Sequence, residues 1–206
     1  APLPVLAAAS PSDCFATAFE ACLLAVEHMT PVIMLSDGYI ANGSEPWCFP
    51  TANDLKKIQT AFLKEKEEDT LLPYKRDEFL VRPWIKPGTK GLEHRIGGLE
   101  KQDGTGNVCY EPLNHEKMVQ LRADKVKKIE DCIPLAQPDS GSDKAQLAVL
   151  SWGSTYGSVK TAVKELLAEG YDVAHIHLRH LNPFPKNLGE LLHQYDKVLI
   201  PEMNSG

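Results

Sequence analysis

Side chains suited to proton transfer and anion binding gather in residues 175–185, which hold three histidines and an arginine and end in two prolines. Successive side chains of a strand point to opposite faces, so His175, His177 and Arg179 share one face. His180 lies on the other face. The prolines remove backbone donors, so we expect the strand to end there. Because ligands collect at the carboxyl ends of strands in open α/β sheets, Arg179 and His180 are candidates for contact with a substrate or another subunit.

A purely structural role is the alternative for this strand, since its histidines can bond to neighbouring backbone. A metal role is disfavoured, because His175 and His177 have no evident third ligand for a tetrahedral site. We therefore assign no metal ligand.

A glycine-rich stretch, residues 92–107, is the second candidate site. Paired glycines let a backbone approach a ligand closely, here beside charged side chains. The charged candidates are His94, Arg95, Glu100 and Asp103. Glycine pairs beside charges are also common in ordinary loops, which is the competing interpretation.

The turn formed by Gly153, Ser154 and Thr155 is the third candidate, because it joins a predicted strand to a predicted helix. Backbone donors at a helix N-terminus can hold an anion. The turn lacks both G-x-G-x-x-G and the Gly-Lys-Ser/Thr ending of a P-loop, so a plain βα turn is the alternative. The sequence also has no Gly-x-Ser-x-Gly or His-Glu-x-x-His motif, and we assign no catalytic residue.

The composition of the 206 residues, with 43% apolar residues and a net charge of −6, predicts a globular α/β protein. The sequence has no long cluster of basic residues that could bind the phosphates of a nucleic acid. It also has no apolar run long enough to cross a bilayer. We expect a soluble, cytoplasmic protein. The five cysteines include no C-x-x-C pair, which disfavours a disulfide scaffold and also the ligation of an iron–sulfur cluster. Cys14 and Cys22 fall in an apolar helical pattern and are expected to be small core residues.

The sequence of the first half of the chain predicts one αβ unit followed by irregular structure. Ser10, Pro11 and Asp13 form a capping-box variant that opens a helix with an apolar stripe. Residues 31–36 lack polar alternation, as expected of a strand buried on both faces. Glycines and prolines then interrupt the periodicity, apart from a short predicted helix at residues 52–66.

A second predicted helix follows, with Asn114 as its cap and an apolar stripe on one side. The stripe consists of Met118, Leu121, Val126, Ile129 and Ile133. Residues 138–143 then have the composition of a linker. We expect residues 31–36 and 147–200 to belong to separate sheets on either side of this region.

The C-terminal region predicts a regular βαβαβ pattern. Its expected elements are strands at residues 147–150, 172–181 and 198–200, a helix over residues 159–167, and a short helix capped by Asn187. This order predicts parallel strands with right-handed crossovers in a three-layer αβα arrangement. Three strands with no covering helix after them, and a start without an initiator methionine, suggest a fragment of a longer polypeptide.

Four stretches resemble the α subunit of 2-oxoacid:ferredoxin oxidoreductases, specifically the 2-oxoglutarate type. They are residues 35–47 (LSDGYIANGSEPW), 94–107 (HRIGGLEKQDGTGN), 152–157 (WGSTYG) and 177–189 (HLRHLNPFPKNLG). They occur in the family's order over nearly the whole chain. This makes the resemblance more specific than any single motif.

The resemblance implies an enzyme that cleaves a 2-oxoacid with coenzyme A and thiamine diphosphate, giving acyl-CoA, carbon dioxide and electrons for ferredoxin. It also implies a domain division. Residues 1–45 would end the pyrimidine-binding domain of thiamine diphosphate, and residues 143–206 would form most of a domain similar to the transketolase C-terminal domain. Residues 46–142 would be an irregular connection with a helix near 114–132.

By the same resemblance, the catalytic glutamate precedes Ala1, and the Mg²⁺–diphosphate motif and the iron–sulfur cysteines belong to the β subunit. Nothing in this sequence supplies a cage of oxygen ligands or clustered thiolates. The expectation is that these groups lie largely outside the chain. The chain would then be mainly architectural, would dock the β subunit and would be inactive alone, with coenzyme A and ferredoxin as partners of the holoenzyme.

Arg95 has a specific candidate role, because a dicarboxylic substrate such as 2-oxoglutarate needs a fixed cation near its distal carboxylate. The competing roles are to tie its loop to a neighbouring domain or to contact the β subunit. A hypothesis from another class is a small-ligand-binding or regulatory α/β module that acts at the Gly153 turn without catalysis.

Overall fold

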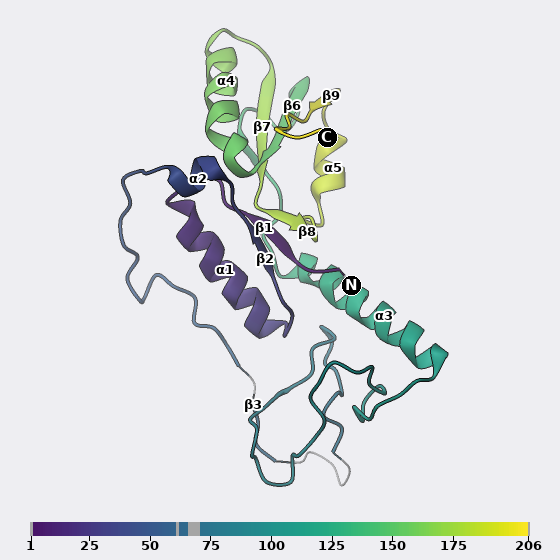
Figure 1. Cartoon of the computed structure of the whole chain (residues 1–206). Helices are drawn as coiled ribbons and strands as arrows, with labels where there is room; N and C mark the ends of the chain where they lie inside the picture. Colours follow the sequence, from purple (N-terminus) through teal and green to yellow (C-terminus); the bar gives the residue numbers. More distant parts are fainter. Residues whose placement is uncertain (1, 61, 66–70, 206) are drawn as a thin grey trace.

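The computed structural model describes residues 2–60, 62–65 and 71–205, and Figure 1 shows two main sheets with helices around them and a long irregular segment. The first sheet has the strand order β2 (Ile33–Leu35), β1 (Val5–Ala7), β8 (His180–Asn182). The second has the order β5 (Pro138–Ser140), β7 (Val173–Leu178), β6 (Leu147–Trp152), β9 (Lys197–Leu199). Parallel strand pairs occur in both sheets, so the predicted α/β class is confirmed. Within the described ranges, no helix combines the length and apolar character needed to cross a membrane.

Helix α1 (Asp13–Glu27) begins three residues after the predicted cap, Ser10. The Asp13 amide donates to Ser10 Oγ at 3.4 Å, and the Asp13 carboxylate accepts from the Ala9 amide at 3.0 Å. These two bonds satisfy backbone donors at the start of the helix. The inner face of α1 joins a buried cluster made of Leu6, Leu23, Leu24, Ile129 and Ile133.

Strand β1 (Val5–Ala7) pairs in parallel with β2 (Ile33–Leu35). The sequence predicted β2 but not β1, because β1 is only three residues long and follows Pro2 and Pro4. The predicted burial of β2 on both faces is wrong. This strand lies at the edge of its sheet, and Ile33 is 42% exposed.

The segment after β2 contains helix α2 (Gly38–Asn42) and the short parallel pair β3 (Phe62–Leu63) and β4 (Trp84–Ile85). The helix predicted at residues 52–66 is wrong, because the described part holds a turn and a strand there instead. The Asp54 carboxylate accepts from both the Thr51 amide and its hydroxyl at 2.8 Å, which closes the turn.

Helix α3 (Pro112–Lys128) starts two residues before the predicted cap, Asn114, and continues into a 3₁₀ turn, η1 (Ile129–Asp131). Proline at the first helical position is favourable because its missing amide would have no partner there. The Asn114 side chain instead bonds the Asp103 amide and the Lys101 carbonyl. The predicted apolar stripe is confirmed except at Leu121, which is half-buried; its buried members are Met118, Val126, Ile129 and Ile133.

The C-terminal elements follow the predicted order. They are β6 (Leu147–Trp152), α4 (Tyr156–Ala168), β7 (Val173–Leu178), α5 (Leu188–Leu192) and β9 (Lys197–Leu199). Valines of α4 pack on one face of β6 and β7, and leucines of α5 pack on the other. The three-layer αβα arrangement is therefore confirmed for this sheet.

The predicted linker at residues 138–143 is partly wrong, because Pro138–Ser140 forms strand β5, antiparallel to β7. Gly141 follows with φ 82°, where a Cβ atom would lie 2.2 Å from the Val173 carbonyl oxygen. Only glycine allows this close approach of two backbones. Gly141, one of the residues whose composition suggested a linker, therefore serves close packing.

The strand predicted at residues 172–181 is divided at Arg179. Its last part forms β8 (His180–Asn182), which pairs antiparallel with β1 in the first sheet. The Ala7 amide donates to the Arg179 carbonyl at 2.9 Å. The prediction of fully separate sheets is therefore wrong, because the C-terminal region contributes a strand to the N-terminal sheet.

These contacts predict where proteolysis begins. The Asn187 side chain bonds both the amide and the carbonyl of Ala136 at 2.8 Å, so residues 136–140 are held on both sides. Residues 43–57 are mostly exposed and contain no helix or strand. Proteinase K is expected to cut first within residues 43–57, as mass spectrometry of early fragments would reveal. First cuts at residues 134–143 would contradict the packing described here.

Candidate functional site

The junction between the two sheets brings together polar side chains from elements that are distant in the sequence. Pairing of β1 with β8 brings the start of α1 against the end of β7. A cavity of about 410 Å³ lies there, which we term the seam cavity. Asp13, Glu20, His177, Arg179 and His180 line it, together with residues 134–139.

Arg179 forms ion pairs with two carboxylates of α1. Its guanidinium donates to Asp13 and, at 3.0 Å, to Glu20 Oε2. His180 Nε2 lies 2.8 Å from Glu20 Oε1, with only 7% of its side chain exposed. Burial raises the pKa of the Glu20 carboxyl, but the bonds and charges of His180 and Arg179 outweigh it and hold that pKa below its ordinary value. We call these four residues the seam clamp.

A second polar group lies behind the seam cavity in the C-terminal sheet. Ser151 and His175 are both 0% exposed. Ser151 Oγ lies 2.7 Å from Nε2 of His175 and 2.8 Å from Nδ1 of His177. The Asp139 carboxylate is 3.8 Å from Nδ1 of His175.

The Asp139 charge favours a proton on Nδ1 of His175, so Nε2 accepts the Ser151 hydroxyl proton. The hydroxyl oxygen then accepts from Nδ1 of His177. Burial lowers the pKa of both imidazoles, that of His177 to about 4. The order Asp–His–Ser resembles a nucleophilic triad, but the fully buried hydroxyl gives no access to a substrate. We therefore interpret this network as structural.

The predicted anion-binding turn forms a 3₁₀ turn, η2 (Gly153–Thr155), which leads into α4. A cavity of about 280 Å³ lies beside it, where β1, β2 and β6 end. Ser154 donates to the Asp37 carboxylate, which lowers the pKa of Asp37. Glu202 also lines this cavity, so an anion there would meet two carboxylates. The geometry does not favour the predicted anion site.

The glycine-rich candidates lie apart from the seam cavity. His94 Nδ1 is 2.8 Å from the Leu92 carbonyl oxygen, and the Arg95 carbonyl accepts from the Tyr74 hydroxyl at 2.9 Å. The Arg95 side chain is exposed. None of these contacts engages the Arg95 guanidinium.

Glu100 and Asp103 tie the glycine-rich segment to α3. Glu100 binds Arg122 at 3.1 Å and His115 at 2.6 Å. The Arg122 bond, opposed by burial and supported by His115, lowers the pKa of Glu100 to about 2. Asp103 binds Lys117 at 2.6 Å, and this bond is the main reason that its pKa is also lowered. Their contacts are those of ion pairs within the chain.

The cysteines are all free thiols, and the core role predicted for Cys22 is wrong because its side chain is exposed on α1. Cys14 is half-buried. Within the described ranges, no group of three or more His, Cys, Asp or Glu side chains could hold a metal ion. The side chains in this described part of the chain therefore do not fit an iron–sulfur cluster or a protein cage for Mg²⁺.

Sequence reasoning missed three members of these networks: Glu20, Ser151 and Asp139. Glu20 sits on a helix whose apolar stripe suggested only packing, and Asp139 lay in the predicted linker. The composition of β6 was a usable signal for Ser151, because a single polar residue in an otherwise apolar, buried strand needs a hydrogen-bond partner.

Comparison with known families supports a single assignment over most of the chain. Residues 1–110 match the family described as "Pyruvate flavodoxin/ferredoxin oxidoreductase, thiamine diP-bdg". Residues 145–206 match "Pyruvate:ferredoxin oxidoreductase core domain II".

Individual relatives agree with this match. The chain is 51% identical over 206 residues to the 2-oxoglutarate oxidoreductase subunit KorA of Mycobacterium tuberculosis, covering all of this chain and 31% of that protein. It is 29% identical over 202 residues to the 2-oxoglutarate synthase subunit KorA of Methanothermobacter marburgensis, covering 98% of this chain and 52% of that protein.

A solved structure also aligns with the fold. It is the 2-oxoglutarate:ferredoxin oxidoreductase from Magnetococcus marinus with 2-oxoglutarate, coenzyme A and succinyl-CoA bound. The TM-score is 0.85 at 29% identity, over 98% of this chain and 35% of that one. The chain thus spans only about a third to a half of the length of these relatives.

Proposed function

The chain belongs to the pyruvate flavodoxin/ferredoxin oxidoreductase family, and from this premise we propose that it is part of the α subunit of a thiamine diphosphate-dependent 2-oxoglutarate:ferredoxin oxidoreductase. The observation that carries the proposal is the 51% identity to a 2-oxoglutarate oxidoreductase KorA subunit along the whole chain. The structural alignment with a 2-oxoglutarate:ferredoxin oxidoreductase supports it.

The proposed reaction is the oxidative decarboxylation of 2-oxoglutarate with coenzyme A. It yields succinyl-CoA and carbon dioxide, and the electrons pass to ferredoxin through an iron–sulfur cluster. Thiamine diphosphate, held with Mg²⁺, supplies the carbanion chemistry when bound. The side chains described here do not fit a metal cage, so we place most of the cofactor contacts in other parts of the enzyme.

The role proposed for this chain is architectural. The β1–β8 pair and the seam clamp join the end of the pyrimidine-binding domain to the transketolase-like domain. We place the former at residues 1–45 and the latter at residues 143–206, with residues 46–142 as the connection and a β subunit docked nearby. Five free cysteines are consistent with a reducing compartment, and we place the enzyme in the cytoplasm.

This function is tested by assaying the complete enzyme, with all its subunits, for 2-oxoglutarate-dependent reduction of a viologen dye. Turnover that requires coenzyme A supports the proposal. No turnover with 2-oxoglutarate in the cofactor-loaded enzyme would overturn it.

Arg95 is proposed as the cation for the distal carboxylate of 2-oxoglutarate, because its exposed guanidinium has no carboxylate partner among the described residues. Arg95→Gln in the complete enzyme is expected to raise KM for 2-oxoglutarate about tenfold or more and to spare any pyruvate turnover. Steady-state kinetics with both substrates measures this difference.

The matched control is Lys90→Gln, which removes another exposed cation of the same region and is expected to leave both KM values within about twofold. An equal loss with both substrates, or dissociation of the subunits, would show that Arg95 is structural.

A further inference from the structure

A cavity of about 620 Å³ lies between helix α3 and the glycine-rich segment, away from the seam cavity. Besides His115, five cationic side chains line it, whereas Glu100 is its single carboxylate among the described lining residues. The cations are Arg76, Arg82, Lys101, Arg122 and Lys125. We call it the cationic cavity.

Carboxylates of the chain neutralise part of this charge. Arg122 binds Glu100 at 3.1 Å, and Arg76 binds Asp103 at 2.7 Å. Both pairs are partly buried, and they fix the two guanidinium groups in place. These two arginines therefore line the cavity in fixed positions, each held by an ion pair.

Arg82 and Lys125 remain uncompensated by any carboxylate in the described ranges. The Arg82 guanidinium carbon lies 4.8 Å from the centroid of the Tyr74 ring. Lys125 donates to the Met29 carbonyl at 3.0 Å. A ring face and a carbonyl orient the two cations but leave their charges unneutralised.

The positive field in this cavity affects Lys125 directly. Burial lowers the pKa of its ammonium group, and the charges of Arg76, Arg82 and Arg122 lower it further. Half-buried like charges that converge in this way cost folding free energy unless an anion offsets them. The arrangement is typical of a ligand site rather than of a solvated surface.

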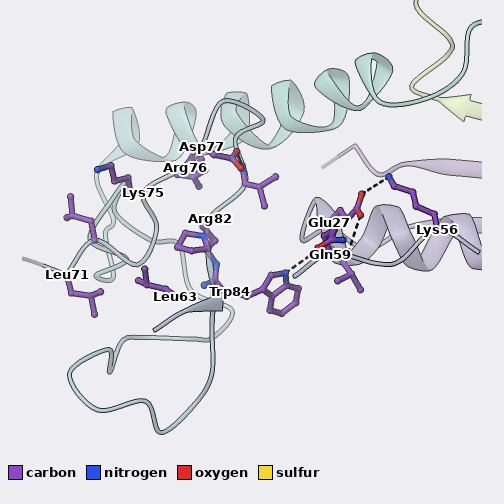
Figure 2. Close-up of a pocket in the computed structure, with 14 residues that line it drawn as sticks. Glu27, Lys56, Gln59, Leu63, Leu71, Lys75, Arg76, Asp77, Arg82 and Trp84 are labelled. Atoms are coloured by element: carbon purple, nitrogen blue, oxygen red, sulfur yellow. Dashed lines mark hydrogen bonds and ion pairs between the residues drawn. The ribbon is translucent and has the colours of Figure 1, made fainter. Parts of the chain in front are cut away.

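Arg76 and Arg82 also line a neighbouring cavity of about 650 Å³, whose lining is mostly apolar and includes Leu63 and Trp84. Figure 2 shows Arg76 close to α3 and Arg82 between it and Trp84. The two guanidinium groups therefore lie at the boundary between two cavities, and the lining of the second also contains the charged side chains of Glu27, Lys56, Lys75 and Asp77.

We propose that the cationic cavity binds a phosphate-bearing small anion, with Arg82 and Lys125 as its principal contacts. A phosphate group carries more charge than a carboxylate and accepts several hydrogen bonds, so it suits a site where more than two cations converge. A monocarboxylate would offset only one charge. The inference rests on this cavity alone and not on the proposed reaction.

The test uses inorganic pyrophosphate as the probe and isothermal titration calorimetry on the complete enzyme saturated with thiamine diphosphate. At an ionic strength of about 0.15 M, where exposed charges are largely screened, saturable binding is expected. Arg82→Gln and Lys125→Gln are each expected to weaken it about tenfold or more. Arg82→Lys retains the charge but loses the planar guanidinium that stacks on Tyr74, so it is expected to weaken binding less than Arg82→Gln does.

Lys127→Gln is the matched control, because Lys127 lies on the same helix as Lys125 but is exposed and does not line the cavity. It is expected to change the affinity by less than about twofold. The proposal is overturned if pyrophosphate does not bind the wild type, if citrate binds as tightly, or if Lys127→Gln weakens binding as much as Arg82→Gln.

Discussion

Replacing Ser151 with alanine is expected to lower the free energy of unfolding by about 2–4 kcal/mol. The hydroxyl is fully buried and lies within 2.8 Å of both His175 and His177. Its removal leaves Nε2 of the fully buried His175 and Nδ1 of the half-buried His177 without this hydrogen-bond partner. Each unsatisfied buried polar group costs about 1–3 kcal/mol.

Urea unfolding at neutral pH, followed by circular dichroism, measures this loss. Ser158→Ala is the matched control, since Ser158 is an exposed residue of α4 and its loss is expected to change stability by less than about 0.5 kcal/mol. Equal stability of the Ser151 and Ser158 variants would show that the buried network is not formed as described.

Arg179→Met is the second substitution with a large expected effect, a loss of about 2–4 kcal/mol. The methionine keeps much of the apolar stem but removes the cation that Asp13 and Glu20 share, so that Glu20 keeps its contact with His180 while Asp13 loses its ion pair. Partial exposure of Arg179, at 37%, keeps the expected loss below that of a fully buried pair. The loss arises at the junction, so β8 is expected to separate from β1 before the rest of the sheets unfolds.

Hydrogen exchange of the amides in β1 and β8, together with urea unfolding, measures both effects. Lys186→Met is the control, because it removes an exposed ion pair, Lys186–Asp131, and should cost less than about 1 kcal/mol. If the Arg179 variant matched this control in stability and exchange, the seam clamp would contribute nothing to joining the two sheets.

Local patterns predicted much of the C-terminal region. Valines spaced along α4 and the apolar runs of β6 and β7 form a βαβ unit because burial of these faces stabilises one arrangement. Similar reasoning failed at residues 52–66. There the helical spacing was present, but the Thr51–Asp54 turn and the pairing of β3 with β4 determine the backbone.

The seam cavity could not be predicted because it depends on contacts distant in sequence. Arg179 and Asp13 are 166 residues apart in the sequence. They meet only because the chain passes at Arg179 from β7 in the second sheet to β8 in the first sheet. The strand pattern did place Arg179 and His180 near the end of a strand, but it did not indicate which carboxylates would bind them. That information lies in the register between β1 and β8, which no local periodicity contains.

The most direct measurement of the proposed function identifies the product made by the complete enzyme from 2-oxoglutarate and coenzyme A. Mass spectrometry should detect succinyl-CoA, formed together with carbon dioxide and a reduced viologen dye, and product formation should depend on thiamine diphosphate. Succinyl-CoA formation with these dependences is the predicted result. A loaded enzyme that forms acetyl-CoA from pyruvate but no succinyl-CoA from 2-oxoglutarate would contradict it.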